Sequence, residues 1–496
     1  MTNRQSLIPQ PKTALFKEGI CRLDNPVVIA VNYESLVPCA EELVQIICQS
    51  GGSATALYSS GHEVPGAQIR LQLLLDASGE MGDEGYRLSV DEEINIGANS
   101  PAGVFYGIQT FRQLLSAEGG FQTLPKCAIE DFPTWGYRGY MLDTGRNYMS
   151  LDFLKRQIDV AASYKLNFFH FHPTEYPGWR IESKAFPNLK SDPCYSQDDM
   201  RELVDYAAAK FITIIPEIEM PGHSTAFLKL MPHLQCTNLT MCMGNEETYA
   251  TLQTIISEVA SIFPGPYLHI GTDECAGGAD CPKCRETWAK LQSYPHAPPS
   301  LMAYFIARMN EIVKDCGKTT MLWNDQIDGG LPRDVIVFSW RHDSSALAIA
   351  DAGFKTVNCH APEVYFDHGF AAEYVPIIFN WSPDDGRELP IPNIIGGEAE
   401  AWHDPPVDHE GQIIEDLGFY PRLLTFAERV WAGPVSAQQS GYTFESYEKR
   451  LLDHKSRYFS QDAFPYPDNP PEHWHKRYEG KWPPPPDEGL TVEGSL

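Results

Sequence analysis

The chain has 496 residues, of which 43% are hydrophobic and 11% aromatic, a composition typical of a globular protein. A chain of this length is too long for one small hydrophobic core, so it is expected to form two domains, or one large barrel with additions. The formal net charge of −28 argues against nucleic acid and anionic membrane surfaces as partners, and it suits a neutral substrate.

The first residues contain no apolar core of signal-peptide length. The sequence also has no run of about 18 apolar residues, which a membrane span would require. Twelve cysteines in a chain of this length do not form a dense disulfide framework. We therefore expect a cytoplasmic protein whose cysteines are reduced thiols.

Residues 1–132 are expected to form an N-terminal α+β accessory domain. Segments 27–31, 69–73 and 85–90 have the residue pattern of strands, and the apolar residues of 103–115 recur with a helical period. This part contains no catalytic cluster, so its expected role is to pack against the rest of the chain.

Residues 133–440 alternate short apolar strands with longer helical stretches, which predicts a parallel sheet. Eight strands with intervening helices over this length indicate a (β/α)8 TIM barrel as the catalytic domain. The expected strands are 139–142, 168–172, 213–217, 267–270, 320–322, 335–338, 356–358 and 394–397. Residues 441–496 are expected to form a short C-terminal extension, a helix followed by a Pro-rich tail.

The strand expected at 267–270 leads directly into two adjacent carboxylates, Asp273 and Glu274. Gly271 and Thr272 mark the strand end, so both side chains can turn toward one pocket. Neighbouring carboxylates cannot both ionise at low cost, so one of them should have a raised pKa. A Glu with a raised pKa beside an ionised Asp would serve as a general acid with an orienting partner, whereas the alternative is an ordinary acidic surface pair.

The C-terminal strand ends of such a barrel hold its catalytic groups, and here they carry carboxylates, histidines, an arginine and tryptophans. Tryptophan faces stack on pyranose rings, while carboxylates and arginine hydrogen-bond sugar hydroxyls. We therefore expect a sugar-binding cleft. The residues at these ends are Asp143, Arg146, His172, Glu175, Glu217, His223, Trp323, Trp340, Tyr365 and Trp402.

An ordered series of motifs along nearly the whole chain resembles the β-N-acetylhexosaminidases of glycoside hydrolase family 20. Each motif is weak alone, but their order is specific. The motifs include Arg138-Gly-Tyr-Met-Leu-Asp143, His172-Pro-Thr-Glu175, Pro216-Glu-Ile-Glu-Met-Pro-Gly-His223 and Ala427-Glu-Arg-Val-Trp431. The resemblance implies an exo-acting, retaining hydrolase without metal or cofactor that removes terminal β-linked N-acetylhexosamine from a small carbohydrate or glycoconjugate.

The resemblance also implies substrate-assisted catalysis. Glu274 would protonate the leaving oxygen, while the substrate's acetamido carbonyl attacks the anomeric carbon and forms an oxazolinium intermediate. Asp273 would orient the acetamido group and stabilise the developing positive charge. N-acetylglucosamine and N-acetylgalactosamine both fit this scheme. In the substrate site that the resemblance implies, Glu175 and His223 resemble the carboxylate–histidine pair that supports the acid. The whole set is Arg146, Glu175, His223, Trp323, Trp340, Tyr365, Asp367, Trp402 and Asp404.

Three positions depart from the usual pattern of that family. The family usually has Gly in place of Thr272, Asp in place of Glu175 and Glu in place of Asp404. Thr272 adds bulk before the acid, and the other two changes keep the charge while moving it by one methylene. We expect activity to survive, with an effect on the preferred sugar or on a substituent of it.

Two alternative functions compete with this interpretation. His170-Phe-His172 is similar to the His-x-His pair of barrel metallohydrolases and, with His223, His269 and Asp273, predicts a metal-dependent hydrolase. The second alternative is a non-hydrolytic N-acetylhexosamine-binding protein that has lost turnover through the three departures. The intact pair of carboxylates argues against it.

A further motif lies just beyond the carboxylate pair. Cys281-Pro-Lys-Cys284 has the spacing of a zinc knuckle, with Cys275 close by. The fourth ligand could be Cys236, Cys242 or a histidine, because local spacing selects none of them. A structural zinc that holds the loop after Glu274 is one reading, but we favour free thiols from the sequence.

Overall fold

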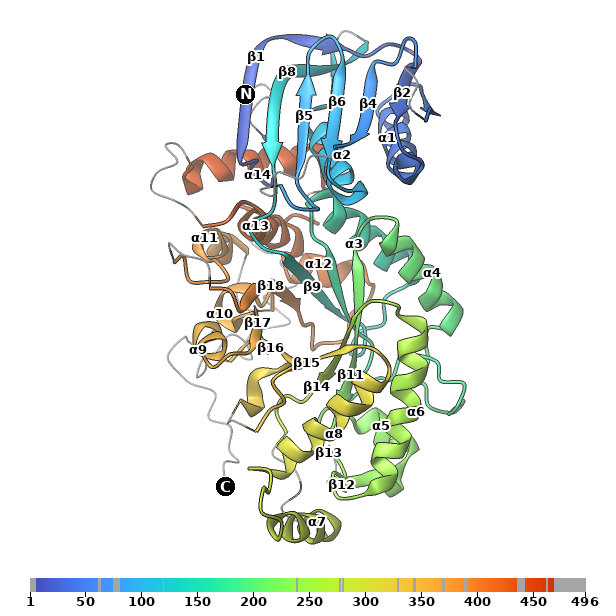
Figure 1. Cartoon of the computed structure of the whole chain (residues 1–496), viewed down its shortest axis with the longest axis vertical. Helices are drawn as coiled ribbons and strands as arrows, with labels where there is room; N and C mark the ends of the chain where they lie inside the picture. The colour runs from blue at the N-terminus through green and yellow to red at the C-terminus, as the bar shows by residue number, and fades with distance from the viewer. Residues whose placement is uncertain are drawn as a thin grey trace.

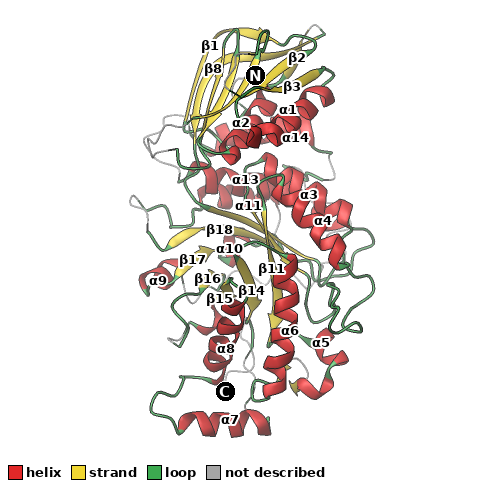
Figure 2. Cartoon of the chain, turned by 45° about the vertical axis from the view of Figure 1, so that its right-hand side comes forward, coloured by secondary structure: helices red, strands yellow, loops and turns green. Residues whose placement is uncertain are grey.

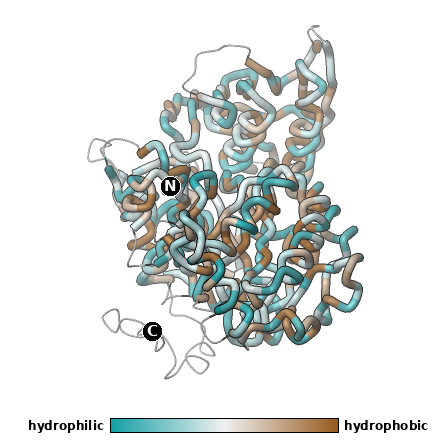
Figure 3. The backbone as a smooth tube through the Cα atoms, turned by 60° about the horizontal axis from the view of Figure 1, so that its bottom comes forward, coloured by the Kyte–Doolittle hydropathy of each residue, from teal (hydrophilic) through white to brown (hydrophobic). Residues whose placement is uncertain are grey.

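A computed structural model of the protein describes most of the chain, and it places a sheet domain on top of a barrel (Figure 1). The described ranges are 6–60, 64–74, 81–118, 120–237, 240–275, 278, 281–327, 330–341, 345–367, 371–387, 391–434, 442–460 and 463–467. Among these, no helix is long and apolar enough to cross a membrane. Figure 3 accordingly shows hydrophobic and hydrophilic residues alternating over short stretches of the tube.

The N-terminal domain is a mixed sheet whose order is β1-β8-β5-β6-β4-β2-β3, with the short strand β7 paired to β8. Helices α1 (Val37–Gln49) and α2 (Pro101–Leu114) cover one face of this sheet (Figure 2). The strands are β1 (Thr13–Arg22), β2 (Val27–Val31), β3 (Ala54–Tyr58), β4 (Ile69–Leu73), β5 (Tyr86–Val90), β6 (Ile94–Ala98), β7 (Ser116–Glu118) and β8 (Phe121–Asp131).

The second domain is a closed barrel of eight parallel strands, which confirms the predicted TIM barrel with its α+β partner domain. Each expected strand overlaps an observed one. In barrel order the strands are β10 (Phe168–His172), β11 (Thr213–Met220), β14 (Tyr267–Gly271), β15 (Thr319–Trp323), β16 (Ile336–Ser339), β17 (Lys355–Asn358), β18 (Ile394–Ala401) and β9 (Tyr137–Asp143).

Helices surround these strands, and N-cap side chains accept hydrogen bonds from the free backbone N–H groups of the first helical turn. The Ser150 hydroxyl accepts a hydrogen bond from the Phe153 N–H at the start of α3, and Ser196 forms a capping box with Asp199 at α4. The helices that follow barrel strands or loops are α3 (Leu151–Ser163), α4 (Gln197–Ala208), α5 (Thr225–Leu230), α6 (Glu246–Ile262), α7 (Pro282–Gln292), α8 (Leu301–Asp315), α9 (Ala346–Asp351), α10 (Ala361–Val364), α11 (Ala371–Asn380), α12 (Gly411–Asp416) and α13 (Phe419–Ala432).

Two smaller features complete the chain. The hairpin of β12 (Gln235–Thr237) and β13 (Thr240–Met241) extends the loop after β11. The helix expected in the C-terminal extension is α14 (Phe444–Tyr458), which lies between the sheet domain and the barrel in Figure 1. The Pro-rich tail expected after it falls outside the described residues from 468 onward.

The two domains meet through buried charges. Lys165, with 1% of its side chain exposed, donates to Asp131 at 2.8 Å, and Asp131 also accepts from the indole N–H of Trp431. Beside this pair, Arg138 forms a two-pronged ion pair with Glu84 at 2.7 and 2.8 Å. These contacts join the end of β8 to the barrel and to α13, so the accessory domain and the barrel are packed as one unit.

Candidate active site

The strand that carries the paired carboxylates ends in a left-handed turn. Gly271, Thr272 and Glu274 all have positive φ, at 64°, 80° and 46°. A Cβ at Gly271 would lie 2.2 Å from an oxygen of Glu219, so only glycine fits there. Thr272 is buried in a conformation that is strained for a β-branched residue, at a cost of about 1–3 kcal/mol. This turn breaks the alternation of the strand and brings Asp273 and Glu274 to the same side.

His223 stands between the two carboxylates. Its Nε2 lies 3.3 Å from Glu274 Oε2 and 3.6 Å from Asp273 Oδ2, while its Nδ1 donates to Glu175 Oε1 at 2.8 Å. Burial lowers the pKa of His223, but Asp273 and the hydrogen bonds with Glu175 and Glu274 outweigh burial and raise it to about 11. The imidazole is therefore positively charged at neutral pH.

The pKa values of the two carboxylates shift in the directions opposite to those predicted. Burial raises the pKa of Asp273 to about 7, helped by the negative charges of Asp325 and Glu217. The hydrogen bond with His223 lowers the pKa of Glu274 instead. The prediction of a raised pKa at Glu274 beside an ionised Asp273 is wrong for the site without substrate. The reason is exposure and pairing, since the side chain of Glu274 is 55% exposed and that of Asp273 only 16%.

Glu175 links His223 to the neighbouring strand. Its second oxygen lies 3.1 Å from Arg146 Nη1 and 3.3 Å from His172 Nε2. Burial would raise the pKa of Glu175, but the hydrogen bonds from His172 and His223 and the charge of Arg146 hold it well below its usual range. Glu175 is therefore a permanent carboxylate that fixes the histidine facing the acid.

Arg146 gathers three carboxylates at the rim of the barrel. Its guanidinium pairs with Asp143 at 2.6 Å and with Asp404 at 3.1 Å, in addition to Glu175. The guanidinium also lies 5.1 Å from the ring of Trp402. The Asp404 side chain is 76% exposed, so this end of the arginine faces the open mouth of the barrel.

Four aromatic rings form one continuous wall at the mouth. The ring of Trp340 lies 6.1 Å from that of Tyr365, which lies 6.3 Å from that of Trp402, and Trp402 lies 6.1 Å from Trp323. Trp323 is held from below, because its indole N–H donates to Glu217 at 2.8 Å. Asp367, which follows Tyr365 by two residues, is half-buried, and burial together with the charge of Asp404 raises its pKa to about 7.

The interior of the barrel beneath this wall is polar. Glu217 accepts hydrogen bonds from His172 and, at 2.7 Å, from His269, while His170 donates to Glu398 at 2.7 Å. The residues of the alternative metal site therefore separate into two places. His170, His172 and His269 bind carboxylates inside the barrel, whereas Asp273 lies at the mouth with His223.

Comparison with known sequences identifies the family to which this chain belongs. The pattern described as "Glycosyl hydrolase family 20, catalytic domain" matches residues 135–434, and "Glycosyl hydrolase family 20, domain 2" matches residues 4–132. The chain belongs to glycosyl hydrolase family 20. The carboxylate pair thus lies in the catalytic domain of a family 20 protein, and the mixed sheet is its domain 2.

Individual relatives agree with this family. A β-hexosaminidase of Porphyromonas gingivalis is 31% identical over 483 residues, which are 86% of this chain and 60% of that protein, so this chain spans three fifths of that relative. The crystal structure of β-N-acetylhexosaminidase from Bacteroides fragilis superimposes with a TM-score of 0.80 at 28% identity, covering 95% of this chain and 100% of the other. A mutant Streptomyces plicatus β-hexosaminidase in complex with its product GlcNAc gives a TM-score of 0.78 at 26% identity, over 94% and 97% of the two chains.

The family 20 fold brings two further residues to the site that the sequence analysis missed. Asp325 accepts hydrogen bonds from the Glu274 backbone N–H at 3.1 Å and from the Trp340 indole at 2.8 Å. Glu219 is buried, and burial together with Asp273 and Glu217 raises its pKa well above the usual range. Both residues could have been found from position, because each follows a noted strand-end residue by two places on the chain.

The departures from the usual family 20 pattern concentrate on one arginine. The longer Glu175 and the shorter Asp404 both pair with Arg146, at 3.1 Å each. One carboxylate is therefore longer and the other shorter by a methylene around the same guanidinium. The third departure, Thr272, stands in the strained turn just before the acid.

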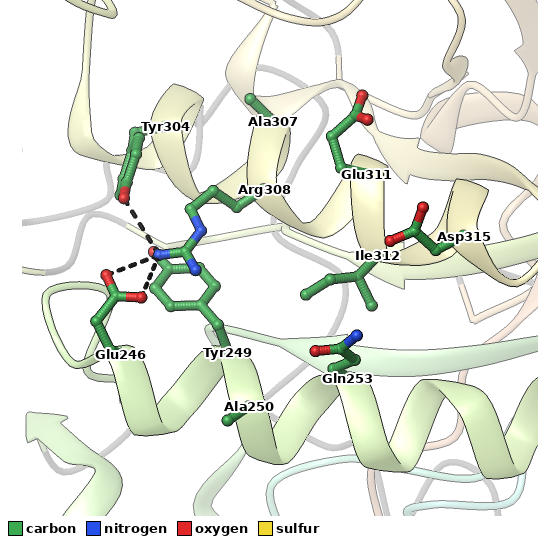
Figure 4. A pocket seen from close by; sticks show the side chains of 10 residues that line it. All are labelled: Glu246, Tyr249, Ala250, Gln253, Tyr304, Ala307, Arg308, Glu311, Ile312 and Asp315. Atoms are coloured by element: carbon green, nitrogen blue, oxygen red, sulfur yellow. Dashed lines mark hydrogen bonds and ion pairs between the residues drawn. The ribbon is translucent and has the colours of Figure 1, made fainter.

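A groove of about 730 Å³ also exists outside the barrel, between α6 and α8. Figure 4 shows that its side chains all come from these two helices, with Arg308 over the ring of Tyr249 and paired with Glu246 at 2.8 Å. None of its lining residues comes from a strand end, so this groove is separate from the family 20 site.

Proposed function

We propose that this protein is an exo-acting, retaining β-N-acetylhexosaminidase that removes terminal β-linked GlcNAc or GalNAc by substrate-assisted catalysis. The observation that carries the proposal is that Asp273 and Glu274, consecutive residues, both face His223 from one strand end. Glycosidases of the two-carboxylate type place these groups on opposite sides of the scissile bond, about 5–5.5 Å apart when one is the nucleophile and about 6.5–9.5 Å apart when water attacks. A consecutive pair suits a reaction in which the substrate supplies the attacking group.

In this reaction Glu274 donates a proton to the glycosidic oxygen, and the bond from that oxygen to the anomeric carbon breaks. The carbonyl oxygen of the 2-acetamido group bonds to the anomeric carbon on the opposite face, which gives the oxazolinium ion. Water then loses a proton to the Glu274 carboxylate and attacks the anomeric carbon, which restores the acetamido group. Two inversions at the same carbon give overall retention.

The protonation of the free site must change for this chemistry. A sugar that covers Glu274 removes water from its carboxyl, which raises its pKa, and the cationic intermediate favours an ionised Asp273 beside it. Substrate binding therefore shifts protonation of the pair from Asp273 toward Glu274. The Nε2 of His223, at 3.6 and 3.3 Å from the two carboxylates, supports transfer between them.

The remaining residues bind the sugar in this proposal. Arg146 and Asp404 lie at the open rim, where they can hydrogen-bond sugar hydroxyls, and Asp367 is near enough for their charges to affect its pKa. The ring wall of Trp323, Trp340 and Trp402 encloses the pyranose and its acetamido group, and the Tyr365 hydroxyl donates to the acetamido oxygen. Glu175 acts through His223 and does not itself touch the substrate.

The test is a comparison of two aryl glycosides that differ at one position. The protein should release phenol from the aryl β-N-acetylglucosaminide or β-N-acetylgalactosaminide, and the sugar released first should be the β anomer by NMR. The matching aryl β-glucoside or β-galactoside, which has a hydroxyl in place of the amide, should be cleaved at least a hundred times more slowly. Equal cleavage of both glycosides would reject the mechanism, and binding of the N-acetyl sugar without turnover would favour the non-hydrolytic alternative.

We also propose a reducing, cytoplasmic location. None of the twelve cysteines forms a disulfide in the structure, although eight are buried and three are half-buried, which supports this location. Fractionation of cells that express the natural gene tests it.

A further inference from the structure

Four cysteines from two distant segments meet near the loop that follows the carboxylate pair. Cys236 lies in β12 and Cys242 directly follows β13, while Cys281 and Cys284 stand at the start of α7. The ligand atoms of all four lie within 4.8 Å of one another. We propose that these cysteines bind one structural zinc ion, a site that is independent of the proposed reaction.

The sulfur positions match a tetrahedral metal site. The Sγ–Sγ distances are 3.6 Å for Cys236 and Cys284, 3.6 Å for Cys242 and Cys281, and 3.8 Å for Cys242 and Cys284. Four sulfurs at about 2.3 Å from a zinc ion form a tetrahedron with edges of about 3.8 Å. A disulfide would need about 2.05 Å between two of them. The cluster therefore has the dimensions of a zinc site.

The backbone around the sulfurs is arranged to hold them together. The N–H of Gly244 donates to the sulfur of Cys242, two residues before it. A Cβ at Gly244 would lie 2.5 Å from the Lys283 carbonyl oxygen and 2.6 Å from the Cys284 nitrogen, so a glycine is needed where the two ligand segments touch. The turns that carry the two pairs of cysteines are thus in direct backbone contact.

The four sulfur ligands favour zinc over other metal ions. Cys242, Cys281 and Cys284 are buried, and thiols are weak hydrogen-bond donors that gain little from packing against one another. Four soft sulfur ligands in a tetrahedron suit zinc and disfavour magnesium or calcium, and a set of four cysteines leaves no open coordination position. The structure therefore favours a zinc site, whereas the sequence alone favoured free thiols.

The position of the cluster gives the zinc a structural role. Cys281 follows Glu274 by seven residues, and the hairpin that bears Cys236 and Cys242 is tied to the turn before His223, because the Met241 N–H donates to the Pro221 carbonyl at 2.8 Å. The metal would therefore clamp together the two loops that carry the histidine and the carboxylates of the candidate site.

The experiment is metal analysis of the full chain purified without chelators from zinc-supplemented cells. We expect about one zinc per chain, as a closed site of four cysteines requires. After removal of zinc and addition of Co²⁺, the protein should show the intense visible absorption of tetrahedral cobalt and a sulfur-to-cobalt charge-transfer band. Cys284→Ser should lose most of the zinc, whereas Cys48→Ser, at an exposed position on α1, should keep it.

The parent chain decides the question even if Cys284→Ser does not fold. The proposal is overturned if the zinc-free parent protein shows no cobalt–thiolate absorption after Co²⁺ is added. A disulfide between any two of the four cysteines would also overturn it. Stoichiometric iron in place of zinc overturns the choice of metal. Loss of thermal stability when zinc is removed, reversed when zinc is returned, supports the clamp.

Discussion

The charge on His223 decides which residue of the candidate site holds a proton. The imidazolium touches Glu175 and Glu274 and faces Asp273, so the exposed Glu274 is stabilised as a carboxylate. Asp273 is more buried, and its Oδ1 has no hydrogen-bond partner among the described residues. Burial without pairing favours the neutral acid, which explains the raised pKa of Asp273.

Replacing Asp273 should reveal its raised pKa, because the stability of the protein then changes differently with pH. The folded pKa of about 7 exceeds the usual 3.8, so the fold favours the protonated form. That contribution is complete below about pH 4 and is lost as the pH rises to about 7. Asp273→Asn should therefore have a higher Tm than the parent at pH 8 and the same Tm near pH 4.

Thermal melts of both proteins between pH 4 and 8 provide the measurement. Asp91→Asn is a suitable control, because Asp91 is an exposed partner of Lys17 with a lowered pKa and should show no gain at pH 8. A parent protein that is more stable than Asp273→Asn at pH 8 would contradict the assignment of the proton to Asp273.

Replacing Glu274 should affect chemistry and leave folding intact. Glu274→Gln cannot protonate a leaving group, so kcat/KM should fall by about 10²–10⁴ for a sugar aglycone. The loss should be much smaller for an aryl substrate with an acidic phenol, because that leaving group departs without a proton. Since the side chain is 55% exposed, Tm should change little. A loss of equal size for both leaving groups would argue against an acid role.

At the scale of elements, the site is assembled from the ends of neighbouring barrel strands and held by shared ion pairs. Arg146 after β9 joins Glu175 after β10 to Asp404 after β18. Below them, Glu217 on β11 accepts hydrogen bonds from His269 on β14 and Trp323 on β15. Each strand end is therefore fixed by its neighbours, which keeps the mouth rigid before substrate binds.

A double-mutant cycle on Glu175 and Asp404 should detect the coupling through Arg146. Glu175→Asp should cost more activity than Asp404→Glu, because Glu175 also holds two histidines and is buried, whereas Asp404 is exposed. In the double variant the longer residue at 404 should recover part of the loss, with a coupling of about 0.5–3 kcal/mol. Measurements of kcat/KM for the four proteins test this, and strictly additive losses would show that the two carboxylates act independently.

At the scale of the whole molecule, the accessory domain is joined to the barrel through a buried ion pair. Lys165 is 1% exposed, and burial lowers its pKa although the charge of Asp131 opposes this. Asp131 also accepts hydrogen bonds from the Tyr86 hydroxyl and the Trp431 indole. Removing one partner of such a pair leaves a buried charge without compensation.

Asp131→Asn should therefore destabilise the whole chain by about 3–5 kcal/mol. The double variant Asp131→Asn with Lys165→Met should recover part of this loss, because it removes the uncompensated charge as well. Urea unfolding of the three proteins provides the measurement. The exposed pair of Lys17 and Asp91 offers the matched control, and its removal should cost at most about 1 kcal/mol. Equal losses at both pairs would mean that the interface does not depend on this ion pair.

The sequence by itself determined the architecture and the family. Strand periodicity is a local property, and strand ends in a parallel barrel always meet at one rim, so the positions of Glu274, His223 and Trp323 followed from chain order. The motifs that resemble family 20 then indicated which of these residues belong to one site. The carboxylate pair needed no tertiary information, because its two members are adjacent in the chain.

Only the tertiary structure decided the protonation and the cysteine cluster. The pKa of Asp273 depends on burial and on charges from other strands, which no local pattern records. Cys236 and Cys281 come from segments 45 residues apart in the chain, so their distance depends on how two loops pack. Electrostatic and metal-binding properties are set by distances across the fold, and those distances exist only once the barrel has closed.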